Sequence, residues 1–290
     1  MARGLVTLIG GSGFVGRYAA RALVEAGWRV RVACRRPFAA QDVKVAGPPG
    51  WVDLVQANIR NRESIARAVD GADAVVNLVG ILFERGKQNF QDAQYHGAGL
   101  VAEVAAEAGI TRFVQISAIG ANETGKAEYA RTKAKGEAAV REHLPGAVIL
   151  RPSIVFGPED QFFNRFAQLA KMSPALPSIG FGKTRFQPVY AGDVADAIAA
   201  AVEREDALGQ TFELGGPRTY SFNELYDFIF ETIQRPRLKV PLPFFVAKPM
   251  GMLSGALFRW VPPLSWGLFG DPPITGGQVD LLRTDNVVAD

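Results

Sequence analysis

Tyr129 and Lys133 lie four residues apart near the middle of the chain. Together, a phenol and an amine of this kind can transfer a proton. That spacing places both on one face of a helix. In a closed pocket, the lysine ammonium would lower the pKa of the phenol and hold a ribose, and the phenol would pass a proton to or from a carbonyl or an alcohol. Ser117, which follows an apolar strand over 112–116, would orient the same oxygen. The same Tyr–Lys spacing is common on ordinary amphipathic helices, so these residues indicate a site only where a cofactor lies beside them.

A glycine-rich turn at the start of the chain predicts such a cofactor site. An apolar run stops at Gly10, and the spacing G-x-x-G-x-x-G continues through Gly13 to Gly16 as a helical pattern begins. Gly10 permits a tight turn, Gly13 lets the backbone approach a phosphate, and Gly16 lets the helix lie close to the strand. The free N–H groups of the first helical turn would then bind a pyrophosphate. The alternative is a plain strand-to-helix turn without a ligand.

The end of the next predicted strand, over 29–33, bears on the choice of nucleotide. Enzymes that use NAD usually carry an acidic residue about 20 residues after the glycines, where it binds the ribose 2′-OH. This chain has Arg35 and Arg36 there instead, and planar guanidinium groups suit a 2′-phosphate. The sequence therefore favours NADP(H) over NAD. The alternative is that both arginines are solvated at a strand end.

Regular alternation of strands and helices predicts a parallel, doubly wound α/β sheet of the Rossmann type, followed by a smaller C-terminal α/β appendage. The predicted strands cover 5–9, 29–33, 51–56, 74–78, 112–116 and 148–152. The turns after the strands would contact the nucleotide, and no metal site is expected. The residues predicted to bind the cofactor are Gly10, Ser12, Gly13, Phe14, Val15, Gly16, Arg35, Arg36, Asn58, Ile59, Leu78, Val79, Gly80, Ser117, Tyr129, Lys133, Pro152 and Ile154.

The chain is expected to divide at the end of the strand over 148–152. Residues 1–152 would form the Rossmann core that binds NADP(H), and residues 153–290 a smaller C-terminal part. Within that part, a helix over 193–203 is predicted to pack back on the core. Residues 240–290 would form an apolar docking region and a tail.

The docking region changes in composition between residues 240 and 274, where Pro, Phe, Leu and Trp are frequent and acidic residues are few. Phe244, Phe245, Trp260 and Trp266 are among its large apolar side chains. One interpretation is an interaction surface for a partner protein or for the membrane interface. The other is a small helical subdomain packed on the core, and the sequence supports both equally.

Composition excludes several classes of function. The net charge of +3 is too small to indicate nucleic acid binding, and a single cysteine, Cys34, excludes an internal disulfide and fits a reducing compartment. Pro, Lys and Arg interrupt every long apolar run, so no membrane-spanning segment is expected. The first strand starts within a few residues of Met1, so no signal or transit peptide is expected.

The glycine turn together with Tyr129 and Lys133 resembles the short-chain dehydrogenase/reductase superfamily in its extended, atypical branch. Three further stretches, over 156–167, 187–190 and 278–288, look like the Rossmann-type accessory subunit of respiratory complex I, the NADH:ubiquinone oxidoreductase. This resemblance covers essentially the whole chain. General epimerases and reductases do not need the middle and tail stretches, which makes the resemblance specific.

The resemblance implies a peripheral subunit that holds NADPH tightly near the quinone end of the complex and is not known to use it in electron transfer. The glycines would bind the pyrophosphate, Arg35 and Arg36 the 2′-phosphate, and Tyr129 and Lys133 the nicotinamide ribose. The implied partners are complex I subunits of the hydrophilic arm and of the membrane interface, with peripheral membrane contact through 240–275. The implied location is the cytoplasmic face of a bacterial inner membrane, or the matrix side of the inner membrane in a mitochondrion.

One position departs from the extended enzymes. Their helix asparagine is replaced by His96, as judged from the following Gly99, which places the usual proton relay in doubt. The favoured hypothesis is therefore a catalytically idle, NADPH-binding accessory subunit that stabilises complex I. The alternative is a soluble NADPH-dependent reductase or epimerase that acts on a sugar nucleotide or a small carbonyl compound, for which Ser117, Tyr129 and Lys133 are the catalytic candidates.

Overall fold

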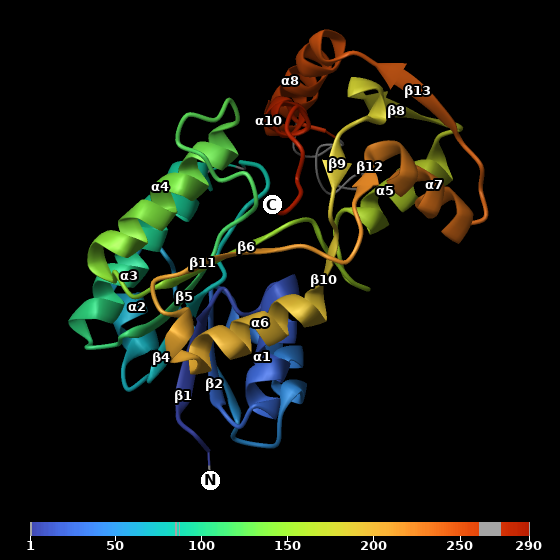
Figure 1. The fold of residues 1–290 in the computed structure, drawn as a ribbon. Coiled ribbons are helices and arrows are strands. Elements are labelled where there is room, and N and C mark those ends of the chain that lie inside the picture. Colours follow the sequence, from blue (N-terminus) through green and yellow to red (C-terminus); the bar gives the residue numbers. More distant parts are fainter. Residues whose placement is uncertain (1, 85, 87, 261–273, 290) are drawn as a thin grey trace.

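The computed structural model describes residues 2–84, 86, 88–260 and 274–289, with 256–260 described by their backbone alone. The chain forms a large lobe around one parallel sheet and a smaller lobe beside the carboxyl ends of its strands (Figure 1). The C-terminal residues return from the smaller lobe to the region between the two lobes.

Seven parallel strands form the sheet, in the order β11-β6-β5-β4-β1-β2-β3. They are β1 (Leu5–Ile9), β2 (Arg29–Cys34), β3 (Val52–Gln56), β4 (Ala74–Asn77), β5 (Arg112–Ile116), β6 (Val148–Pro152) and β11 (Thr211–Leu214). Apolar runs such as the one over 74–76 are buried on both faces, as parallel strands covered by helices must be. The strand order reverses between β1 and β4, which is where such sheets bind ligands. The predicted doubly wound fold is confirmed.

Helices cover both faces of the sheet (Figure 1). On one face, α1 (Phe14–Glu25) packs against α6 (Ala191–Glu203). The other face is covered by α2 (Arg62–Val69), α3 (Gly97–Glu107) and α4 (Glu128–His143). The short helices η1 (Pro37–Ala46), η2 (Gln91–His96) and η4 (Glu205–Ala207) lie in the connections. After the chain has passed into the smaller lobe, α6 and η4 lead back to β11. Strand β11 pairs with β6 and forms one edge of the sheet.

The smaller lobe is built on an aromatic core. Phe166, Phe222 and Tyr226 are buried together, with Phe166 and Phe222 edge-to-face at 5.5 Å between ring centroids. The elements of this lobe and of its connections to the core are β7 (Val155–Phe156), α5 (Phe163–Met172), β8 (Ala175–Ile179), η3 (Gly180–Gly182), β9 (Arg185–Phe186), β10 (Val189–Tyr190), β12 (Tyr220–Ser221), α7 (Phe222–Thr232), β13 (Leu238–Leu242), α8 (Phe244–Trp260) and α10 (Gly276–Leu281).

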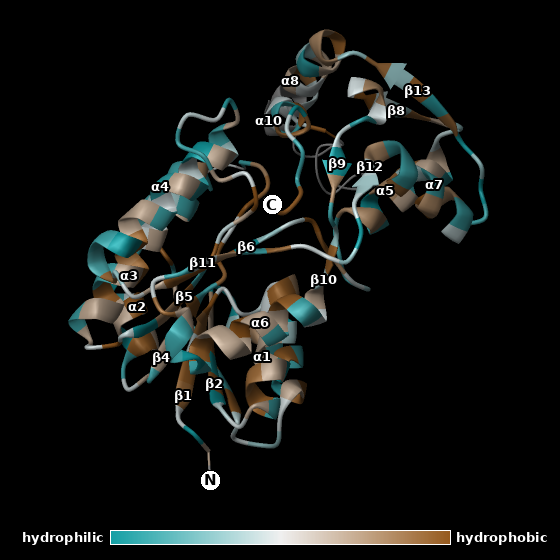
Figure 2. Cartoon of the chain, viewed as in Figure 1, coloured by the Kyte–Doolittle hydropathy of each residue, from teal (hydrophilic) through white to brown (hydrophobic). Residues whose placement is uncertain are grey.

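Helix α8 has one packed side and one exposed side. Ala247 is buried with Val279 of α10, whereas Phe245 is 78% exposed and Leu253 is 70% exposed. Figure 2 shows hydrophobic residues along α8. The inner side of α8 therefore belongs to a packed subdomain, and Phe245 and Leu253 on its outer side are apolar and exposed. An interaction surface on that outer side stays a prediction. The side chain of Trp260 and the whole of Trp266 lie outside the described residues.

No helix in the part of the chain that the structure describes combines the length and the apolar character needed to cross a bilayer.

Candidate functional site

The glycine turn lies where β1 ends and α1 begins. Gly10 adopts a φ of +82°, and a Cβ there would come within 2.9 Å of the Val79 side chain. A Cβ on Gly16 would lie 2.4 Å from the carbonyl oxygen of Gly11, so only glycine allows this close approach of helix and strand. Gly13 is exposed, and a Cβ there would meet nothing closer than the Gly10 oxygen at 3.5 Å.

The first turn of α1 is free to receive an anion. No side chain caps its N-terminus, and its first turn contains no acidic residue. The unpaired N–H groups and the helix dipole therefore favour a phosphate at this position. Together with the open backbone at Gly13, this cradle fits the pyrophosphate of a dinucleotide.

Helix α4 brings Tyr129 and Lys133 to the same edge of the sheet. Lys133 is 5% exposed, and its Nζ donates to the carbonyl oxygen of Ile116, at the end of β5, at 3.1 Å. A Cβ on Gly80, in the loop after β4, would lie 3.3 Å from the same Nζ. Burial lowers the pKa of Lys133 to about 8, although the carboxylate of Glu137 opposes this shift. The amine is thus held between the loops after β4 and β5.

The pKa of Tyr129 shifts in the direction opposite to the sequence-based expectation. Burial raises it to about 12, so the expected lowering by Lys133 is wrong for this structure. The ring packs edge-to-face on Phe90, with 6.0 Å between centroids. At physiological pH the phenol is protonated, and it can donate a hydrogen bond but is a poor base.

Ser117 forms a hydrogen bond to a different group from the one expected. Its hydroxyl donates to the Glu137 carboxylate. The next residue, Ala118, has no hydroxyl that could take its place. Among the described residues, the structure gives no hydrogen bond between Ser117 and Tyr129. The three predicted catalytic residues therefore lie near one another, but the serine belongs to a polar network beneath the tyrosine and lysine.

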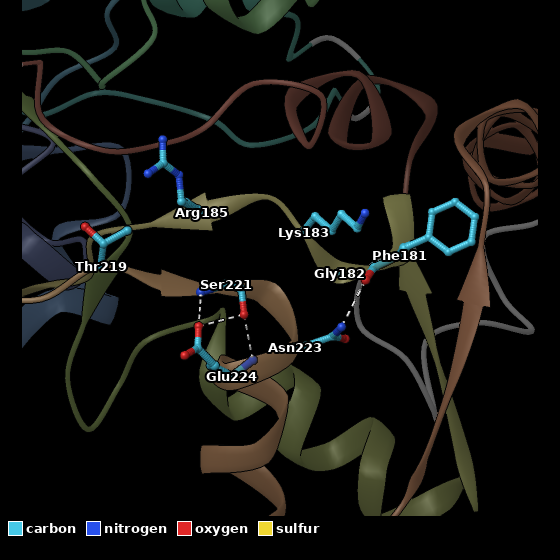
Figure 3. Close-up of a pocket in the computed structure, with 8 residues that line it drawn as sticks. All are labelled: Phe181, Gly182, Lys183, Arg185, Thr219, Ser221, Asn223 and Glu224. Atoms are coloured by element: carbon cyan, nitrogen blue, oxygen red, sulfur yellow. Dashed lines mark hydrogen bonds between the residues drawn. The ribbon is translucent and has the colours of Figure 1, made fainter.

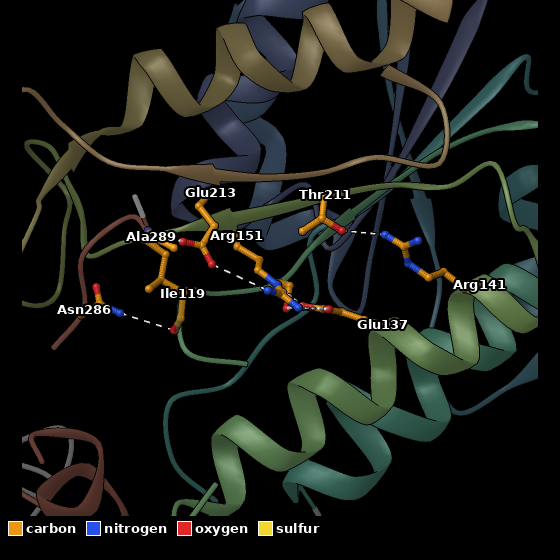
Figure 4. A network of polar contacts seen from close by, with 9 residues as sticks. Ile119, Glu137, Arg141, Arg151, Thr211, Glu213, Asn286 and Ala289 are labelled. Atoms are coloured by element: carbon orange, nitrogen blue, oxygen red, sulfur yellow. Dashed lines mark hydrogen bonds and ion pairs between the residues drawn. The ribbon is translucent and has the colours of Figure 1, made fainter. Parts of the chain in front are cut away.

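That network centres on a partly buried ion pair between α4 and β6 (Figure 4). Arg151 binds Glu137 through two contacts, Nε–Oε1 at 2.9 Å and Nη2–Oε2 at 2.6 Å, and reaches Glu213 of β11 at 3.6 Å. Glu137 is 6% exposed. Sequence reasoning missed Glu137 and Arg151, although Glu137 follows Lys133 by four residues and so shares its helix face.

The predicted contacts for the adenosine half lie at the ends of β2 and β3. Arg35 and Arg36 are exposed, and Arg35 Nη1 donates to Gln88 Oε1 at 3.3 Å. Asn58 is also exposed, and its Oδ1 accepts from the N–H of Arg60 at 3.1 Å. Ile59 packs against Gly97 at the start of α3, where a Cβ on the glycine would lie 2.6 Å from Ile59 Cγ1.

The remaining predicted residues surround the glycine turn. Val79 N–H donates to the side chain of buried Asn77, which donates in turn to Gln115. The other residues also lie at the carboxyl edge of the sheet: Ser12, Phe14 and Val15 at the start of α1, Leu78 after β4, and Pro152 and Ile154 at the end of β6. The structure thus brings the residues from β1, β4, β5 and β6 to one edge, with Arg35, Arg36, Asn58 and Ile59 farther along it.

The π-helix after β4 places His96 at the surface and Gln94 in the interior. His96 is exposed, and its ring lies against Tyr95. Gln94 is buried instead, donating to the Ile81 oxygen at 2.8 Å and accepting from Thr132 of α4 at 2.9 Å. The segment over 91–96 is a π-helix, so its buried and exposed positions do not follow α-helical spacing. The replacement of the helix asparagine by His96 stays a prediction.

A second hollow lies in the smaller lobe and contains none of the predicted residues (Figure 3). It opens beside the start of α7, whose N-terminus is already capped by Ser221 and Glu224. Asn223 Nδ2 donates to the oxygen of Phe181, which holds that residue at a φ of +61°. Ser221, Glu224 and Asn223 in this hollow are engaged in capping α7 and in the bond to Phe181, and the edge of the large sheet remains the candidate site.

The fold and the cradle define a nucleotide-binding protein of the Rossmann class. Residues 6–215 match the NAD dependent epimerase/dehydratase family, and the chain belongs to that family. The family's description supports a nicotinamide dinucleotide as the cofactor of this site. The UDP-glucose 4-epimerase of Thermus thermophilus, solved with NAD, superposes with a TM-score of 0.66 over 82% of this chain and 86% of its own, at 22% identity, which supports the fold.

Relatives of higher sequence identity indicate a more specific group of proteins. The chain is 36% identical to NADH dehydrogenase [ubiquinone] 1 alpha subcomplex subunit 9 of Arabidopsis thaliana, over 99% of this chain and 71% of the plant protein. The rat protein of the same name is 36% identical over 87% of this chain and 67% of its own. A ceramide reductase of Caulobacter vibrioides is 34% identical over 98% of this chain and 86% of its own. The predicted resemblance to the complex I subunit is confirmed.

The buried amine of Lys133 should make stability depend on pH. Its pKa is about 8 in the folded chain and 10.5 when unperturbed, so between these values the unfolded chain binds more protons and stability rises with pH. We expect the free energy of unfolding of the wild type, relative to Lys133→Met, to rise by about 2 kcal/mol between pH 7.5 and 10. Urea denaturation at the two pH values measures this. Lys126→Met, at an exposed lysine, controls for loss of charge, and a pH-independent difference for Lys133→Met would contradict the prediction.

Proposed function

We propose that this protein is an accessory subunit of respiratory complex I that holds NADPH and stabilises the complex near its membrane and quinone end. The observation that carries the proposal is the identity to subunit 9 of NADH dehydrogenase [ubiquinone], which extends over 99% of the chain. It includes the smaller lobe and the C-terminal residues, beyond the family match over 6–215.

The site suits retention of a nucleotide. The α1 N-terminus and the glycine turn would hold the pyrophosphate, and Tyr129 and Lys133 the nicotinamide ribose. Arg35 and Arg36 supply two exposed guanidinium groups where a 2′-phosphate would lie, which favours NADPH. When bound, the nicotinamide would supply hydride chemistry. The chain's own groups favour an idle site, because the phenol of Tyr129 has a pKa of about 12 and the hydroxyl of Ser117 is bound to Glu137.

The outer side of α8 supports a docked position within the complex. Phe245, Met252 and Leu253 are more than half exposed, and large exposed apolar groups on one element favour burial against a partner or a bilayer interface. We infer peripheral attachment through this region, at the cytoplasmic face of a bacterial inner membrane or on the matrix side in a mitochondrion.

Association with complex I is the first test. A tagged chain, extracted from its native membranes in mild detergent, should co-purify with other complex I subunits. Phe245→Asp should reduce that recovery several-fold, because it places a charge on the apolar side of α8. Phe38→Asp is the matched control, since Phe38 is 94% exposed on the core lobe. Elution of the wild-type chain alone would exclude the subunit role.

The choice of nucleotide is tested by removing the two arginines. Arg35→Ala with Arg36→Ala should weaken NADPH binding about 10- to 100-fold, because hydrogen bonds to a charged phosphate are lost, and should leave NADH binding nearly unchanged. Titration calorimetry with both nucleotides measures the two losses. Lys44→Ala, at an exposed residue of η1, controls for the change of net charge. Equal losses for both nucleotides would refute the assignment of the 2′-phosphate.

A second function is favoured by the identity of 34% to a ceramide reductase. In that case the chain would be an NADPH-dependent reductase, and Tyr129 would donate the proton to a carbonyl oxygen. Steady NADPH oxidation with a panel of carbonyl compounds, including detergent-solubilised lipid ketones, should then be abolished by Tyr129→Phe and retained by Tyr95→Phe. If the wild type keeps its nucleotide and shows no turnover on the panel, the reductase function is rejected in favour of the subunit role.

A further inference from the structure

After α10 the chain crosses from the smaller lobe to the core. We call residues 282–289 the return segment. Its first half is tied to the smaller lobe, where Thr184 Oγ1 donates to the carbonyl oxygen of Leu282 and Asp285 pairs with Arg185 at 2.8 Å. Its second half contacts the core, where Ala289 N–H donates to Glu213 at 2.9 Å.

Asn286 is the centre of this crossing. Its carbonyl oxygen accepts from Gln187 N–H at 3.1 Å, and its Oδ1 lies 2.6 Å from Ser153 Oγ, which donates to it. Its Nδ2 donates to the carbonyl oxygen of Ile119 at 3.4 Å (Figure 4). Ser153 is 6% exposed, so its hydroxyl is satisfied inside the protein and not by bulk water. One side chain thus links the segments that follow β5 and β6.

Those two segments flank the nicotinamide half of the site. Ile119 lies two residues after Ser117, and Ser153 lies between Pro152 and Ile154. The segments also bind one another, since Ile119 N–H donates to the Pro152 oxygen at 3.1 Å. We propose that Asn286 is a positioning residue, which keeps both segments closed on the nicotinamide side and so makes nucleotide retention depend on the docked return segment. This inference rests on the proposed nucleotide binding.

A second connection leads from the return segment to the same site. Ala289 contacts Glu213, which contacts Arg151, and Arg151 holds Glu137 beneath Lys133. The return segment is also continuous with α10, which packs on α8. Because coupling between two binding events is reciprocal, a bound nucleotide must also favour the docked return segment. The nucleotide would therefore help to order the helices that carry the apolar docking side.

The test measures nucleotide release from the full-length protein. Asn286→Ala should release NADPH about tenfold faster than the wild type, because its two side-chain hydrogen bonds, to Ser153 and to Ile119, are lost. Hydrogen exchange over 117–122 and 152–155 should rise in the same variant, and NADPH should slow exchange over 282–289 in the wild type but not in the variant. Asp285→Asn is the matched control, because it weakens the neighbouring tie to Arg185 and leaves the contacts of Asn286 in place.

Several outcomes would overturn the proposal. If Asn286→Ala lowers the melting temperature but leaves NADPH release unchanged, the residue is only structural. If Asp285→Asn accelerates release equally, attachment of the segment matters and the Asn286 contacts do not. Should Asn286→Ala fail to fold, Ser153→Ala removes the same bond from the core side and must accelerate release. A wild-type protein that binds no NADPH would reject the nucleotide-binding function as well, which distinguishes the two failures.

Discussion

The ion pair between buried Glu137 and partly buried Arg151 is the interaction on which the site depends. Removing two charges from water is costly unless each finds partners of good geometry. Glu137 accepts two hydrogen bonds from Arg151 and one from Ser117, and its charge offsets part of the cost of burying Lys133. Since the guanidinium contacts are bidentate, they fix the rotation of α4 relative to β6. This rotation directs Lys133 and Tyr129 toward the edge of the sheet.

The opposite side of α4 is fixed by close packing. A Cβ on Gly136 would lie 2.0 Å from the carbonyl oxygen of Gln94, so this glycine lets α4 approach the helix that follows β4. Thr132 of α4 donates to the side chain of Gln94. The helix is therefore held between an ion pair on one side and a backbone contact on the other. Its depth sets the burial of Lys133, and with it the low pKa of the amine.

Features set by local sequence could be predicted, whereas features set by distant contacts could not. The glycine turn, the buried strands and the Tyr–Lys pair each lie within a few residues of sequence, where spacing determines the structure. The partner of Ser117 lies 20 residues away and that of Ser153 lies 133 residues away, and no periodicity indicates either pair. The π-helix over 91–96 changed the face on which His96 lies. The pKa of Tyr129 could not be foreseen, because desolvation depends on the packing around the ring.

The contacts of Tyr129 and Ser117 suit the proposed role, in which the site holds a nucleotide without turning it over. A reductase needs a phenol near its working pKa and a hydroxyl free to orient a carbonyl oxygen. Here the phenol stays protonated and the hydroxyl is bound to a carboxylate that also carries an ion pair. Freeing Ser117 for catalysis would remove one partner from a buried charge, at a cost of about 1–3 kcal/mol. The network is thus consistent with the proposed idle site, in which Tyr129 and Lys133 would hold a ribose.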